Sequence, residues 1–206
     1  MPGRIALRVT TSLAVLLLLT GQPEAYGQWL PGVRVFLPLA QAGESAASAP
    51  DLIVERISTA GGTVQVTIRN IGAAPVAVPF WVDLYIAPRA APTGVNQTWP
   101  TLGARGMAWG VDVALPAGGA LTFAPGDRFY RADFSNPGGP IAAGTQLYAQ
   151  VDSANTATDY GAVRERHEIG GGPYNNIAAA TATASAWRGP GGTAAAPAWA
   201  GLPGRR

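Results

Sequence analysis

The chain contains no cysteine and no lysine, and it has a single histidine, His167. The absence of cysteine excludes thiol catalysis, disulfides, thiolate metal sites and a lipid anchor attached through an acylated cysteine. One histidine cannot supply the two or three nitrogen ligands of a typical hydrolytic zinc site. All fourteen basic residues are arginine, which together with the excess of alanine, glycine and proline is typical of a GC-rich genome. We therefore give the arginine content little functional weight.

The formal net charge of +2 comes from the ends of the chain. Residues 51–177 carry ten acidic side chains and eight arginines, a net charge of −2. A surface that binds nucleic acid needs a basic stripe on the folded body, so the sequence predicts no nucleic-acid partner. The 206 residues suffice for one domain with extensions, and 27 glycines and 18 prolines favour short strands and turns over long helices.

The first 27 residues have the organisation of a bacterial export signal. Arg4 and Arg8 precede an apolar run that includes residues 13–20, and Ala25 and Gly27 stand at the −3 and −1 positions of a cleavage site. The run is shorter than the roughly 20 apolar residues of a spanning helix, although an uncleaved membrane anchor is the alternative. We expect a secreted, extracytoplasmic or cell-surface protein with no membrane span after cleavage.

Two low-complexity segments flank the predicted domain. Residues 28–50 form a linker whose apolar stretch, residues 33–40, is either an extra edge strand, a segment that docks elsewhere or associates with membrane, or a partly ordered arm. Residues 185–206 form an Ala/Gly/Pro tail that we expect to be disordered.

The domain itself, residues 51–184, shows the alternation of apolar and polar residues that is typical of strands. In residues 78–87 the apolar side chains of Phe80, Val82, Leu84 and Ile86 alternate with Trp81, Asp83 and Tyr85, so we expect the first set to face the core. A loop of unusual length, residues 88–106, follows. The pattern predicts an all-β, antiparallel Ig-like or fibronectin-III-like sandwich of seven or eight strands, at residues 52–58, 63–70, 78–87, 107–113, 119–124, 128–134, 146–152 and 176–184.

Five short motifs occur in an order that resembles the CARDB family, the adhesion-related Ig-like modules of bacterial exported proteins. They are Arg69-Asn70-Ile71-Gly72, Val82-Asp83-Leu84-Tyr85, Leu115-Pro116-Ala117-Gly118, Gln150-Val151-Asp152 and Tyr174-Asn175-Asn176. The resemblance covers residues 50–184, and the long loop and the glycine run at residues 170–172 depart from it. It implies a module that mediates adhesion or spaces other domains, without catalytic residues.

The acidic loop after residue 151 holds the candidate metal ligands. Calcium accepts carboxylate and amide oxygens, but EF-hand spacing is absent, so a calcium site is an alternative to a protein with no cofactor. The candidates are Asp152, Asn155, Asp159, Glu165 and Glu168. His167 in the same loop could also serve a serine triad with Ser135 or Ser153, but neither serine lies in a nucleophile-elbow context, so we predict no enzyme activity and read His167 as part of a solvated charged loop.

Four aromatic residues are the candidate ligand-binding residues: Trp81, Tyr85, Trp99 and Trp109. They could form a platform that stacks on sugar rings, or they could pack where the long loop folds back on the sandwich. The sequence thus predicts a non-enzymatic exported interaction or structural module that contacts a protein or a cell-surface polysaccharide, with a carbohydrate-binding module as the alternative function.

Overall fold

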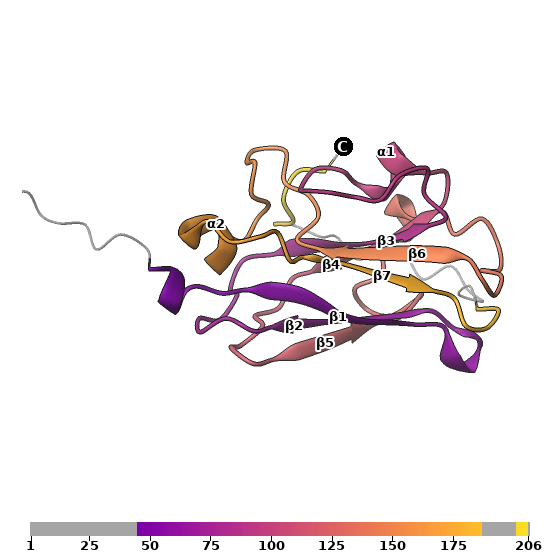
Figure 1. Cartoon of the computed structure of the whole chain (residues 1–206), viewed down its shortest axis with the longest axis horizontal. Helices are drawn as coiled ribbons and strands as arrows, with labels where there is room; N and C mark the ends of the chain where they lie inside the picture. The colour runs from indigo at the N-terminus through magenta and orange to yellow at the C-terminus, as the bar shows by residue number, and fades with distance from the viewer. Residues whose placement is uncertain (1–44, 187–200, 206) are drawn as a thin grey trace, which may run out of the picture. The chain divides into compact units, whose positions relative to one another are not determined.

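The computed structural model describes residues 45–186 and 201–205, which contain two antiparallel sheets packed face to face (Figure 1). One sheet has the strand order β1-β2-β5 and the other the order β4-β3-β6-β7. This confirms the predicted all-β sandwich, with seven strands. The strands are β1 Leu52–Ser58, β2 Gln65–Asn70, β3 Phe80–Ile86, β4 Gly106–Val111, β5 Ala120–Phe123, β6 Gln146–Val151 and β7 Ile177–Thr181.

Several predicted segments lie outside the described residues. These are the export signal, the apolar arm at residues 33–40 and most of the tail. In residues 45–186 and 201–205, no helix has the length and apolar character needed to cross a membrane.

One predicted strand, at residues 128–134, is wrong. The Asp127 carboxylate accepts the backbone N–H groups of Phe129 and Tyr130, both at 2.9 Å, and so turns the chain out of any ladder. A 3-10 helix, η3 Ala132–Phe134, follows directly. Tyr130 keeps a single bridge to Trp109 of β4.

The core lies between the inner faces of the two sheets. The four apolar residues of β3 that were predicted to face inward are all at most 1% exposed. Trp109 of β4 is completely buried beside Phe123 of β5, with ring centroids 6.0 Å apart, and its Nε1 donates to the carbonyl of Ala124 at 3.1 Å. A buried indole with its N–H satisfied joins the two sheets without any disulfide.

The outer face of β3 and β4 is buried as well, which the alternating pattern does not predict. All residues of both strands are buried, because the long loop after β3 and its short helix α1 Trp99–Leu102 fold over this face (Figure 1). The Trp99 backbone N–H donates to Asp83 Oδ2 at 3.0 Å, and the Tyr85 hydroxyl lies 2.7 Å from the carbonyl of Gln97. The loop therefore covers the outer face of β3.

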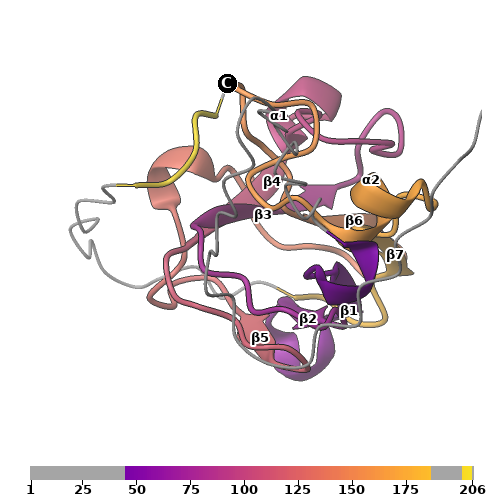
Figure 2. The ribbon, with the colours of Figure 1, turned by 90° about the vertical axis from the view of Figure 1, so that its left-hand side faces the viewer.

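The chain's C-terminal segment covers the rest of that face. Residues 201–205 lie against β3 and β4 beside η3 (Figure 2), and the Trp81 indole N–H donates to the carbonyl of Pro203 at 2.8 Å. These residues belong to the tail that we expect to be mostly disordered, and they contact Trp81, Asp83 and Thr156.

The acidic loop contains a second short helix, α2 Arg166–Gly170, at one end of the sandwich (Figure 1). Glu165 and Glu168 form a reciprocal capping box at its start, and Gly171 ends it in the left-handed conformation with φ of 75°. His167 lies on this helix with a side chain only 8% exposed, so the expectation of a solvated loop histidine is wrong.

Candidate functional site

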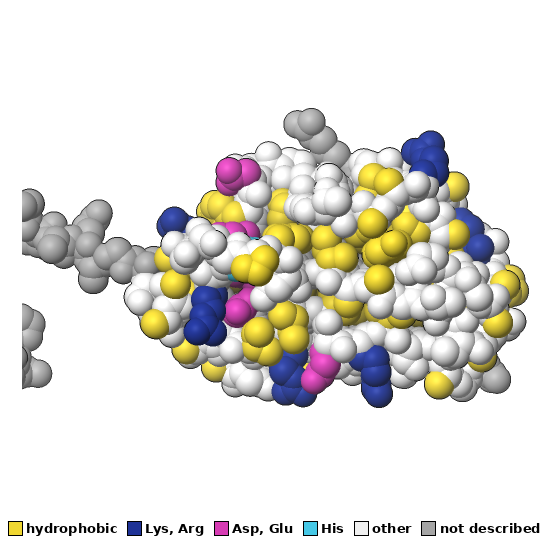
Figure 3. All heavy atoms as spheres, viewed as in Figure 1, with side chains coloured by type: hydrophobic (Ala, Val, Ile, Leu, Met, Phe, Trp, Pro, Cys, Tyr) yellow, Lys and Arg dark blue, Asp and Glu magenta, His cyan; other side chains and the backbone are white. Residues whose placement is uncertain are grey.

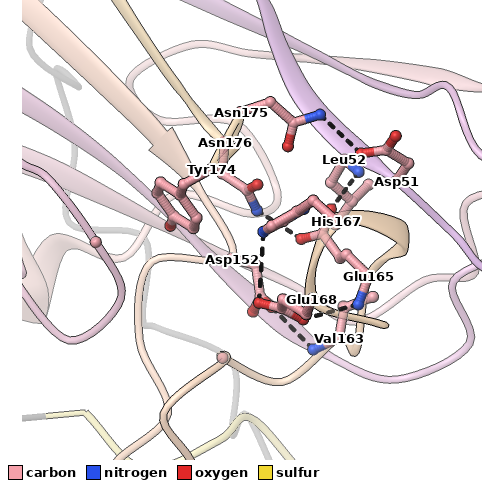
Figure 4. Close-up of polar contacts among 12 residues, drawn as sticks. Asp51, Leu52, Asp152, Val163, Glu165, His167, Glu168, Tyr174, Asn175 and Asn176 are labelled. Carbon is pink, nitrogen blue, oxygen red and sulfur yellow. Dashed lines mark hydrogen bonds and ion pairs between the residues drawn. The ribbon is translucent and has the colours of Figure 1, made fainter. Parts of the chain in front are cut away.

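The loop between β6 and β7 begins at a buried carboxylate. Asp152 has φ of 51°, is completely buried, and accepts the backbone N–H groups of Ala162 at 2.9 Å and Val163 at 2.8 Å (Figure 4). Both oxygens thus hold the far side of the loop against the end of β6. Asp152 fixes where the chain leaves the sheet.

Glu165 ties the same loop to two strands. Its side chain is completely buried, Oε2 accepts the backbone N–H of Leu52 at 2.5 Å, and Oε1 accepts the Asn176 amide at 2.5 Å (Figure 4). Leu52 begins β1 and Asn176 immediately precedes β7. One carboxyl group therefore joins elements that belong to different sheets.

Asp51 and His167 complete a cluster around Glu165. One carboxylate oxygen from each acid and one ring nitrogen of His167 lie within 4.8 Å of one another. Asp51 Oδ1 accepts the Asn175 amide at 2.8 Å, while Asn175 Oδ1, His167 Nδ1 and His167 Nε2 have no hydrogen-bond partner among the described residues. His167 Nε2 lies 3.6 Å from Glu168 Oε1. Several buried polar atoms here remain unsatisfied, which is uncommon in native proteins.

Burial dominates the protonation of the cluster. It raises the pKa of Glu165 to about 9, against the opposing hydrogen bonds from Leu52 and Asn176, and the nearby charges of Asp152 and Glu168 raise it further. Burial also raises the pKa of Glu168 to about 7. For His167, burial lowers the pKa and the charge of Asp51 only partly opposes it, so the ring is neutral near pH 7 and has a free lone pair.

The donor atoms of this cluster fit a divalent cation. Each Glu165 oxygen accepts one hydrogen bond, and a cation would bind the remaining lone pairs by displacing the proton that burial retains on this carboxyl group; neutral imidazole has a lone pair of its own. A cation would use the unsatisfied His167 nitrogen and would remove the penalty of buried, crowded carboxylates. A hollow of about 340 Å³, lined in part by Asp51, His167 and Asn175, provides a path to the cluster.

The calcium ligands predicted from sequence do not all lie together. Glu165 belongs to the Asp51–His167 cluster, and Asp51 was missed because it stands before a strand with no motif around it. Asn155 binds within its own loop, accepting the Ala157 N–H at 3.0 Å. Asp159 and Glu168 line a separate hollow of about 610 Å³ between this loop and the loop after β3. Among the described residues, the potential ligands that lie together are Asp51, Glu165 and His167. This group includes a nitrogen ligand, unlike the all-oxygen group predicted for calcium.

The four aromatic candidates do not form an exposed platform. Trp81, Tyr85 and Trp99 lie on the outer face of the second sheet under the loop and the C-terminal segment, and Trp109 lies in the core. All four are at most 7% exposed. The burial of these side chains agrees with the alternative in which they pack within the sandwich and under the long loop, not with a platform for sugar rings.

The serines considered for a triad have structural roles or no access to solvent. Ser135 Oγ accepts the Ala108 N–H at 2.9 Å and donates to the Arg131 carbonyl at 2.6 Å. Ser153 is completely buried. On the face drawn in Figure 3 the arginines lie apart from one another.

Comparison with known proteins found a similar solved structure. No protein-family model and no curated protein matches the chain. Among solved structures, the chain is similar to the CARDB domain of a Pyrococcus furiosus protein, crystallised in complex with di-metal ions, with 20% identity, a TM-score of 0.31, and coverage of 66% of this chain and 89% of that one. The likeness is to the family that the five motifs resemble, and the fold itself is that of an all-β sandwich.

Proposed function

We propose that this chain is a non-enzymatic, exported interaction module whose last loop holds a divalent cation between Asp51, Glu165 and His167. The observation that carries the proposal is the group of unsatisfied buried atoms around two carboxyl groups and a neutral imidazole. The export signal in the first 27 residues supports an extracytoplasmic location. The use of Asp152, Glu165 and Ser135 as structural ties supports a binding role over catalysis.

The ligand set favours a borderline metal such as Zn²⁺ over Ca²⁺. Imidazole nitrogen suits zinc and its neighbours in the first transition series, whereas calcium takes six to eight oxygen ligands. Three protein ligands leave coordination positions free for a group supplied from outside. We infer that an acidic group of a partner protein or cell-surface polymer fills such a position, and that the cation fastens the loop to the start of β1.

Thermal unfolding with added cations tests the metal. Saturating Zn²⁺ should raise the Tm of the parent protein above that in chelator, because a ligand that binds the folded state stabilises it. His167→Ala should lose this rise, while Asp112→Asn, which changes an exposed acid outside the cluster, should keep it. No rise with Zn²⁺, or an equal rise in His167→Ala, would refute the site.

Binding to cell surfaces tests the interaction role. The mature protein should retain an acidic polysaccharide in a pull-down with Zn²⁺ and release it in chelator. His167→Ala should retain none under either condition. Retention that is independent of metal and of His167 would place the interaction elsewhere on the module.

A further inference from the structure

The C-terminal segment occupies a groove that is built into the outer face of the second sheet. We define this C-terminal groove by Trp81, Asp83, Ala108, Gly110, Phe134 and Thr156. Trp81 pairs with Gly110 and Asp83 pairs with Ala108 across β3 and β4, so bulky and charged side chains of one strand face small residues of the other. The small residues line the bottom of the groove, and the rings of Trp81 and Phe134, with centroids 5.2 Å apart, line one side of it.

The groove recognises the backbone and two side chains of the segment. The Trp81 indole donates to the Pro203 carbonyl at 2.8 Å, and the Thr156 backbone N–H donates to the Gly204 carbonyl at 3.0 Å. The Leu202 side chain occupies the space above Gly110, where any Cβ on Gly110 would collide with it. Backbone bonds with a pocket for an apolar side chain are the usual means of recognising an extended peptide.

Arginine is the specific feature of the ligand. Arg205 Nη2 donates to Asp83 Oδ2 at 2.8 Å, and Nη1 lies 2.5 Å from Oδ1. The guanidinium carbon lies 4.9 Å from the centre of the Trp81 ring. A planar fork matched to a carboxylate and stacked on an indole distinguishes arginine from lysine.

The residue before the arginine packs closely against Thr156, so a larger residue there requires the Thr156 side chain to rotate. A Cβ at Gly204 would lie 2.6 Å from Thr156 Oγ1, inside van der Waals contact. The groove therefore recognises a pattern of four residues: an apolar side chain, any residue, a small residue for which glycine fits best, and arginine.

We propose that the C-terminal groove is a peptide-binding site for extended segments of this pattern in a partner protein, and that the chain's own residues 202–205 are a resident ligand that keeps it closed. Charge complementarity argues for such a partner, because the covered groove pairs the Asp83 carboxylate with a guanidinium group. Since the resident segment is attached to the same chain, its effective concentration is far above that of a free peptide at micromolar concentration. Opening the groove to a partner thus requires loss or displacement of the resident segment.

Titration with the hexapeptide Gly-Leu-Pro-Gly-Arg-Arg tests the proposal on the full chain, with Trp fluorescence or calorimetry as readout. Arg205→Ala removes the anchor of the resident segment without altering the groove, so this variant should bind the peptide saturably and at least tenfold more tightly than the parent does. Arg56→Ala, which changes an exposed arginine of β1, should behave like the parent. Absence of saturable binding by Arg205→Ala up to about 1 mM peptide, or equal binding by the parent, would overturn the proposal.

Changes in the peptide test the groove without altering the protein. Lysine in place of both arginines should weaken binding to Arg205→Ala at least fivefold, and alanine in place of the second glycine should weaken it as well, because the Thr156 side chain must then rotate. Asp83→Asn combined with Arg205→Ala should lose the preference for arginine over lysine. Equal binding of the arginine, lysine and alanine peptides would show a nonspecific contact and overturn the proposal.

Discussion

Arg205 and Asp83, 122 residues apart in the chain, form a two-point ion pair whose side chains are 2% and 0% exposed. Asp83 lies in the middle of β3, on the face that loops and the C-terminal segment cover. An ion pair this well enclosed is weak evidence of net stability, but loss of one partner leaves a buried charge. This asymmetry gives the first prediction.

Arg205→Ala should lower the free energy of unfolding by about 2 kcal/mol in urea titrations. The loss should be below the value typical of fully enclosed pairs, because release of the terminal segment lets water reach Asp83. Asp83→Asn combined with Arg205→Gln should recover part of the loss, since no charge then stays unpaired. Arg128→Ala, which removes an ion pair with side chains 63% and 40% exposed, should cost less than about 1 kcal/mol.

Gly110→Ala should release the C-terminal segment by filling the space of Leu202. We expect faster proteolysis at the C-terminus and an altered Trp81 fluorescence. The double variant with Arg205→Ala should be hardly less stable than either single variant, because both act on one contact. Gly94→Ala is the matched control, since a Cβ there meets no atom within 4 Å. Additive effects of the two changes would contradict a shared contact.

Asp152 should make stability depend on pH. Burial raises its pKa to about 7 from an ordinary value of 3.8, so the folded protein keeps a proton that the unfolded chain releases. The stabilisation is therefore complete below about pH 4 and is lost as pH rises through 7, with a slope of up to about 1.4 kcal/mol per pH unit. Urea unfolding in chelator should show in the parent the summed slope of Asp152, Glu165 and Glu168, and in Asp152→Asn a slope that is smaller by the share of Asp152. An unchanged slope in the variant would assign the effect to other groups.

Trp99→Ala should destabilise the fold by about 3 kcal/mol. Trp99 is 7% exposed, and its Nε1 donates to the Phe134 carbonyl at 2.9 Å, so its removal leaves a cavity and an unpaired carbonyl beneath the loop. Ile71→Ala, at a side chain 45% exposed, should cost less than about 1 kcal/mol. If Trp99→Ala unfolded at the parent's urea concentration and lost binding to a sugar polymer, the carbohydrate-binding alternative would regain support.

Local patterns predicted most of the sandwich. The strand predicted at residues 52–58 has its observed bounds, and the four side chains of β3 that were predicted to face inward belong to the observed core. The strand prediction at residues 128–134 was wrong because hydrogen bonds to the Asp127 side chain compete with the backbone hydrogen bonds of a sheet. The alternation of apolar and polar residues carries no information about that competition. The alternation of small and large residues in β4, with Gly106, Ala108 and Gly110 on one face, is the sequence signal that could have indicated a covered outer face.

The sequence by itself determined the strand periodicities, the lack of thiol chemistry and the negative charge of the body, because each depends on residue type and near-neighbour spacing. The partners of Glu165, Asp51 and Asp83 were decided only by tertiary structure. Leu52 lies 113 residues from Glu165, and Arg205 lies 122 residues from Asp83. Such pairings depend on which sheet edges and loops meet, and burial in the folded chain then raises the pKa of Glu165.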